Sequence, residues 1–163
     1  MTLVVDVQYA LDDPAEDDSE LPSPEDFQRW ASAALAGRCP AGEMTVRVVG
    51  LVEGAALNQT YRRRSGPTNV LSFPIENPAE TDPPLLGDVV ICAPMVRREA
   101  EEQYKTTQAH WAHMTVHGAL HLLGYDHEET EEAEIMERLE RDILAGLGYA
   151  DPYAADKAAR AAC

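Results

Sequence analysis

Residues 107–127 read TQAHWAHMTVHGALHLLGYDH, and this stretch is the most informative part of the chain. Helical signals run from about Thr107 to Leu123. Gly124 is well placed to end that helix, because glycine accepts the left-handed backbone conformation that terminates helices and turns the chain. We therefore predict a long helix and a turn in the C-terminal half of the chain.

Four of the five histidines lie on this predicted helix, and the fifth follows the turn. A helix rises about 1.5 Å per residue, so two histidines four residues apart can converge on one ion, whereas three at successive four-residue steps spread over roughly 12 Å. We predict that His117 and His121 share one metal ion with His127, which the turn brings back. Three histidines leave a fourth coordination position for water, the pattern of a catalytic zinc site.

Three further side chains near the cluster have more than one interpretation. His113 and His110 precede His117 by about one and two helical turns. Either could be a fourth ligand, a supporting partner of a ligand or a packing residue; we expect His113 to pack or to support the site, and His110 to lie on the surface. Asp126 either orients a metal-bound imidazole, as neighbouring carboxylates commonly do, or is a cap or solvated.

The position after the first histidine distinguishes this motif from that of a protease. Metzincin proteases share the histidine spacing and the glycine, but they place a glutamate directly after the first histidine as general base. Here that position is Gly118. Peptide hydrolysis by that mechanism lacks the group that accepts a proton from water, and the protease interpretation is disfavoured.

One segment of the acidic chain is locally basic because it is rich in arginine. The formal net charge is −16, yet residues 44–74 contain four arginines and one glutamate. Arg62, Arg63 and Arg64 end a short predicted helix, and guanidinium groups bind phosphate with paired donors. Beside an open zinc site they favour phosphodiester cleavage. The alternative is a solvated helix end stabilised by the helix dipole.

Composition limits the remaining classes. A chain of 163 residues with 45% hydrophobic residues fits one soluble domain. Three widely spaced cysteines without a CxxC pair indicate a reducing, cytoplasmic location. No apolar run is long enough for a membrane span. The acidity argues against DNA as a partner, and we interpret the acidic runs at 12–26 and 128–142 as solvated faces.

The order of predicted elements indicates an α+β fold in one domain over residues 1–163, with its core at 2–148 and a frayed tail at 149–163. We expect a small mixed β-sheet of about four strands covered by about five helices, with the metal site on a helix of the C-terminal half and the turn after it. The predicted strands are Thr2–Tyr9, Met44–Val52, Asn69–Pro74 and Gly87–Cys92. The predicted helices are a Ser23-capped helix ended by Gly37, Glu53–Arg64, one from Pro94 to about Tyr104, Thr107–Leu123 and Glu129–Leu147.

Two motifs resemble the YbeY-type bacterial endoribonucleases, metal-dependent proteins associated with ribosomal RNA maturation and ribosome quality control. The first is HGALHLLGYDH at 117–127, and the second is LNQTYRRRSGPTNVLSFP at 57–74. LGD at 86–88 and AHM at 112–114 support them, and the resemblance extends from about Val5 to Leu147.

The resemblance implies roles for named residues. His117, His121 and His127 match the family's metal ligands, and Arg62 matches the arginine implicated in RNA cleavage. Arg63 and Arg64 are added as substrate-binding residues by their proximity alone. The implied function is a single-strand-directed, zinc-dependent endoribonuclease with Arg62 and His117 as catalytic residues, and with ribosomal RNA and the small ribosomal subunit as partners.

Two alternatives remain open from the sequence. One is a ribosome-assembly factor that binds through the same surface and holds a structural zinc. The other is a metallohydrolase of amides or peptides, which Gly118 disfavours. The attacking nucleophile, water or the RNA 2′-hydroxyl, is left open.

Overall fold

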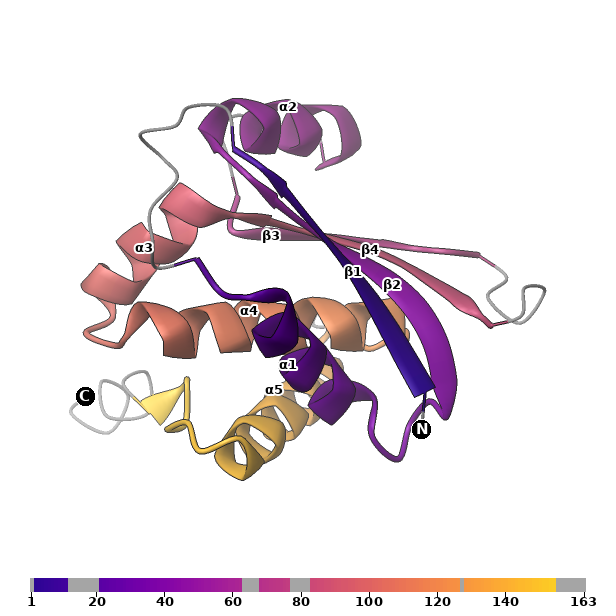
Figure 1. The fold of residues 1–163 in the computed structure, drawn as a ribbon. Coiled ribbons are helices and arrows are strands. Elements are labelled where there is room, and N and C mark those ends of the chain that lie inside the picture. The colour runs from indigo at the N-terminus through magenta and orange to yellow at the C-terminus, as the bar shows by residue number, and fades with distance from the viewer. Residues whose placement is uncertain (1, 12–20, 63–67, 77–82, 127, 155–163) are drawn as a thin grey trace.

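The structure of the chain, a computed structural model, describes residues 2–11, 21–62, 68–76, 83–126 and 128–154. Its strands are β1 (Thr2–Ala10), β2 (Ala41–Val49), β3 (Val70–Pro74) and β4 (Leu85–Cys92). Its helices are α1 (Pro24–Leu35), α2 (Leu51–Arg62), α3 (Ala93–Glu102), α4 (Thr107–Leu122) and α5 (Thr130–Gly146). Figure 1 shows their arrangement.

The four strands form one mixed sheet in the order β1-β2-β4-β3. β1 is parallel to β2 and β2 is parallel to β4, whereas β3 is antiparallel to β4. Val89 in β4 is paired with Val46 of β2 and with Ser72 of β3. Strand β4 is therefore interior to the sheet, and both of its faces need cover.

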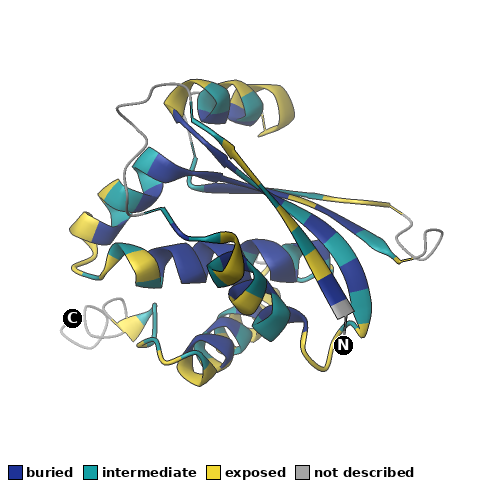
Figure 2. Ribbon diagram, viewed as in Figure 1, coloured by how far each residue is buried: buried dark blue, intermediate teal, exposed yellow. Residues whose placement is uncertain are grey.

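Helices cover the two faces of the sheet unequally. Helices α1, α4 and α5 lie on one side and α2 lies on the other (Figure 1). Because side chains alternate along a strand, Val89 and Ile91 enter the large core, whereas Val90 and Cys92 enter a smaller cluster with Leu57 of α2. Figure 2 shows the difference: α4 is mostly buried and α2 is mostly exposed or intermediate.

Three aromatic side chains join α1 to α4 in the large core. The ring of Phe27 lies 5.7 Å from that of Trp30 and 5.8 Å from that of Trp111, edge to face in both cases, and all three are buried. Such pairs add about 0.5–1.5 kcal/mol each beyond the burial of apolar area. Ser23 caps α1 in a capping box with Asp26, as the sequence predicted.

The predicted α+β fold is confirmed, with a four-stranded mixed sheet and five helices in the described part of the chain. The predicted end of the second strand is wrong: β2 ends at Val49, and Val52 belongs to α2 with 72% of its surface exposed. The apolar run continues past the strand because α2 begins at once, with the Gly54 N–H donating to the Gly50 carbonyl. Of the helices described, none has the length and apolar character to cross a membrane. The domain boundaries stay predictions. The predicted tail does not fray from Tyr149: the Tyr149 N–H donates to the Leu144 carbonyl and the Tyr153 hydroxyl donates to Glu140, while residues 155–163 lie outside the described residues.

Candidate metal centre

Helix α4 carries the histidines beneath the sheet and ends where the sequence predicted. Thr106 caps its N-terminus by accepting a hydrogen bond from the Ala109 N–H at 3.1 Å. At the other end, the Gly124 N–H donates to the His121 carbonyl and the Tyr125 N–H to the Leu120 carbonyl, the pattern of a Schellman motif. Gly124 has φ +99°, the conformation expected for it.

His117 and His121 point the same ring atom at each other. Their Nε2 atoms are 3.2 Å apart and their ring centroids 4.7 Å apart. Two nitrogens bound tetrahedrally to one zinc ion, at about 2.0–2.1 Å each, lie about 3.3–3.4 Å apart. The pair therefore fits two adjacent ligand positions around one ion. His127, the predicted third ligand, lies outside the described residues.

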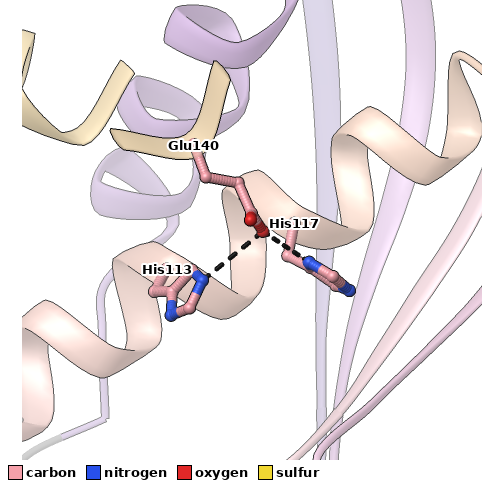
Figure 3. A group of neighbouring side chains, drawn as sticks. All are labelled: His113, His117 and Glu140. Atoms are coloured by element: carbon pink, nitrogen blue, oxygen red, sulfur yellow. Dashed lines mark hydrogen bonds and ion pairs between the residues drawn. The ribbon is translucent and has the colours of Figure 1, made fainter. Parts of the chain in front are cut away.

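The other ring nitrogen of His117 is engaged by a buried carboxylate. His117 Nδ1 forms a hydrogen bond with Oε1 of Glu140, which α5 brings against α4 (Figure 3). A neutral imidazole has one donor and one acceptor nitrogen, so a proton on Nδ1 leaves Nε2 as the acceptor. That is the tautomer a metal at Nε2 requires.

Glu140 is completely buried, with 0% of its surface exposed. Burial raises its pKa, but hydrogen bonds with His113 and His117 outweigh burial and bring the pKa of Glu140 well below its usual range. Tyr153 donates its hydroxyl hydrogen to Oε2 at 2.5 Å. Burial and the charge of Glu140 raise the pKa of Tyr153, so this hydroxyl keeps its proton. The carboxylate is ionised and held by three side chains.

A second grouping of side chains could also hold a metal ion. One ligand atom each from His113, His117 and Glu140 lies within 4.8 Å of the others (Figure 3). His113 Nε2 lies 3.4 Å from Glu140 Oε1, and burial lowers the pKa of His113. An ion there would have to replace the hydrogen bond between His117 and Glu140. An ion between His117 and His121 would replace only the 3.2 Å contact between their Nε2 atoms and would leave the hydrogen bond between His117 and Glu140 in place.

The prediction that His110 lies on the surface is wrong. It is 2% exposed, and its Nε2 is 2.8 Å from Oε1 of Glu99 on α3. Burial raises the pKa of Glu99, but hydrogen bonds with His110 and Asn69 outweigh burial, and the net pKa of Glu99 is lowered. His110 is therefore a packing and hydrogen-bonding residue one helical turn beyond His113, which is buried as expected.

A groove of about 410 Å³ opens at the two facing imidazoles. His117 and His121 line it together with Arg62, at the end of α2, and Asp126 and Glu128, which follow the Gly124 turn. Arg62 is exposed, so its guanidinium can meet a ligand without loss of a buried contact. Arg63 and Arg64 lie outside the described residues. The structure thus brings Arg62, His117 and His121 to one groove.

Comparison with known proteins shows which family the chain belongs to. A model of the family described as Endoribonuclease YbeY matches residues 15–148. The chain belongs to the YbeY family. It is 54% identical over 156 residues to a protein named Endoribonuclease YbeY from Pseudomonas entomophila (strain L48), covering 95% of this chain and 96% of that protein.

A solved structure has the same fold as this YbeY-family chain. The solution structure of TM1509 from Thermotoga maritima superposes with a TM-score of 0.56 at 22% identity, covering 86% of this chain and 91% of that one. The similarity supports the architecture of sheet and helices.

Packing explains why this YbeY-family chain has glycine where a metzincin has its glutamate. A Cβ atom added to Gly118 would lie 2.5 Å from Val89 Cγ1 of β4. The Gly118 carbonyl also accepts a hydrogen bond from the Ser72 hydroxyl at 3.2 Å. Position 118 faces the sheet at contact distance, so the site has no general base there.

Glu140 is the site residue that sequence reasoning missed. Glu140 belongs to the acidic run at 128–142, whose composition predicts a solvated face, and for Glu140 that prediction is wrong because the residue is buried. The helical period was the available signal: Met136 lies four residues before it and Leu144 four residues after, and both are buried. In this YbeY-family chain Glu140 lies on the core-facing side of α5.

Proposed function

We propose that the chain is a metal-dependent endoribonuclease that cleaves single-stranded RNA in ribosomal RNA maturation and ribosome quality control, in the cytoplasm. One observation carries the proposal: His117 and His121 face each other at zinc-binding distance in a groove that Arg62 also lines. The 54% identity to a protein named Endoribonuclease YbeY supports RNA as the substrate. We propose ribosomal RNA and the small ribosomal subunit as its partners.

The proposed metal is one zinc ion held by His117, His121 and His127. Asp126 and Glu128, the sequence neighbours of His127, both line the groove, which supports the third ligand. When bound, zinc would act as a Lewis acid that polarises a phosphoryl oxygen. His117 contributes through Nε2, while its Nδ1 keeps the proton shared with Glu140.

Arg62 is the proposed phosphate-binding residue. Cleavage of a phosphodiester builds negative charge on the phosphate oxygens, and a guanidinium can donate two parallel hydrogen bonds to them. Arg62 is positioned by the last turn of α2, is exposed and lines the groove. Arg63 and Arg64 are proposed to extend this contact along the RNA backbone.

An exposed aromatic ring beside Arg62 supports a preference for single strands. Tyr61 is 63% exposed and packs edge to face on Phe73, with ring centroids 4.9 Å apart. Both residues line the groove. Unpaired bases stack on such rings, whereas the bases of a duplex are already stacked on one another.

The test is cleavage of one RNA sequence in two states. Zinc-loaded protein is incubated with an unstructured RNA, with the same RNA annealed to its complement, and with DNA of the same sequence. The proposal predicts cleavage of the unstructured RNA alone. Cleavage of none of the three would contradict it and would favour an assembly factor that only binds.

A further inference from the structure

The buried carboxylate of Glu140 is not used by the proposed reaction. A charge removed from water is costly unless it is paired and hydrogen-bonded. Glu140 meets that demand with side chains from two other places in the chain: His113 and His117 on α4, and Tyr153 after α5. Glu140 thus has three polar contacts next to the proposed metal site, and Figure 3 shows the two that it makes with His113 and His117.

The contact between Glu140 and His117 determines which ring nitrogen of His117 points into the groove. Glu140 binds the Nδ1 side of the ring, while the Nε2 side lies 3.2 Å from His121 Nε2. Carboxylates that accept a hydrogen bond from a ligating histidine fix its tautomer and orientation and raise its basicity. Without Glu140, the ring could rotate or carry its proton on Nε2, and both changes oppose metal binding.

Tyr153 is held in a way that keeps Glu140 in place. Gly148 has φ +93° and turns the chain after α5, and the Tyr149 N–H donates to the Leu144 carbonyl at 2.8 Å. The Tyr153 N–H then donates to Oδ1 of Asp151 at 2.8 Å. The chain thereby returns toward α4 and directs the Tyr153 hydroxyl at the carboxylate oxygen that His117 does not use.

We propose that Glu140 is a positioning residue that orients His117 for metal binding, and that Tyr153 in turn positions Glu140. The inference rests on the proposed metal site of His117 and His121. It makes Tyr153, which follows α5, part of the metal centre, although Tyr153 is not a ligand. Metal affinity should therefore depend on the Tyr153 hydroxyl, which is linked to the proposed ligand His117 through two successive hydrogen bonds.

The competing assignment makes Glu140 a ligand together with His113 and His117. The two assignments differ in their dependence on His121. If Glu140 positions His117, loss of His121 should abolish tight zinc binding, and loss of the Glu140 charge should weaken it. If Glu140 is a ligand, loss of its charge should be the more severe change, and His121 should be dispensable.

Zinc affinity measured by competition with a chromophoric chelator separates these cases. Glu140→Gln should weaken zinc binding about 10–100-fold, the range typical for a partner that orients a ligand. Tyr153→Phe, which removes only the hydroxyl, should weaken it about three- to tenfold. Tyr149→Phe removes a hydroxyl from the same segment and is the matched control, with wild-type affinity expected. The melting temperature of each metal-free variant is measured in parallel.

A double variant tests whether Tyr153 acts through Glu140. Adding Tyr153→Phe to Glu140→Gln should change zinc affinity by less than about twofold, because groups in one network are not additive. Independent, additive losses would overturn that part of the proposal. A role in folding alone would lower the metal-free melting temperature and leave zinc affinity unchanged.

Two results overturn the proposal as a whole. One is wild-type zinc affinity in Tyr153→Phe and Glu140→Gln; if Glu140→Gln does not fold, Tyr153→Phe decides alone. The other is loss of zinc binding in Glu140→Gln while His121→Ala retains it. RNA plays no part in these measurements, so a chain that binds zinc as described but leaves RNA intact contradicts the proposed function and not this inference.

Discussion

Helices α4 and α2 line the same groove but are built in opposite ways. α4 is buried along most of its length, and its His117 is hydrogen-bonded to a carboxylate with no exposed surface. α2 buries only Gly54 and Asn58, and Arg62 at its end is exposed. The metal-binding side of the groove is therefore held in place by core packing, whereas the proposed phosphate-binding side is exposed to solvent. Changes on α4 should affect both folding and activity, and changes at Arg62 should affect activity alone.

The largest expected effect is that of His117→Ala. The variant should lose at least about 10³-fold in RNA cleavage, because the several kcal/mol that a metal contributes to the transition state are lost with it. It should also melt at a lower temperature without metal, because Glu140 loses a hydrogen-bond partner in the core. Cleavage assays and thermal melts check both effects. Wild-type cleavage by His117→Ala would break the assignment of the metal centre to α4.

Arg62→Ala should reduce the cleavage rate about 10²–10³-fold, the usual effect of removing one donor to transition-state charge. Its melting temperature should stay at the wild-type value, because Arg62 is exposed. Arg62→Lys should cleave faster than Arg62→Ala but more slowly than the wild-type protein, because the lysine ammonium keeps the positive charge but lacks the paired donors of a guanidinium. Arg98→Ala, at an exposed arginine of α3 that lies outside the groove, is the control. If Arg62→Ala melted at a lower temperature than the wild-type protein while Arg98→Ala did not, the contrast between the two helices would be contradicted.

Gly118→Ala should lower the free energy of unfolding by about 1–3 kcal/mol, the usual cost of overpacking. The added methyl group meets Val89 at 2.5 Å, so α4 or β4 must shift. Gly146→Ala is the matched control, because nothing lies within 4 Å of its added Cβ atom and alanine favours a helix. Urea unfolding of both variants measures the difference. Equal stability would mean that α4 does not press on β4 at this point.

The smallest expected effect is that of salt on RNA binding. The chain has a net charge of −16, and Asp126 and Glu128 line the groove beside Arg62. With Arg62, Arg63 and Arg64 as the phosphate contacts, the logarithm of the binding constant should fall with the logarithm of salt concentration with a slope no steeper than about −2. Titrations of single-stranded RNA at several salt concentrations measure it. A much steeper slope would require a basic surface beyond these three residues.

The sequence predicted those features that depend on residues near one another in the chain. The helix, the Gly124 turn and the approach of His117 to His121 follow from spacing along a helix and from the backbone freedom of glycine. The capping box of Ser23 and Asp26 is equally local.

The features that were missed depend on contacts between distant elements. Glu140 and His110 look like surface residues by type, and only the packing of α5 and α3 against α4 buries them. The sequence has no local signal for the bond between Tyr153 and Glu140, because a turn after α5 must first bring the two together. The order of strands in the sheet is likewise a property of the whole fold.

The most direct test of the account is a zinc titration of metal-free protein with cleavage of an unstructured RNA as the readout. The account predicts no cleavage without metal, and a rate that rises in proportion to added zinc and levels off at one ion per chain. Cleavage that is undiminished in the metal-free protein would contradict the assignment of the reaction to the site at His117 and His121.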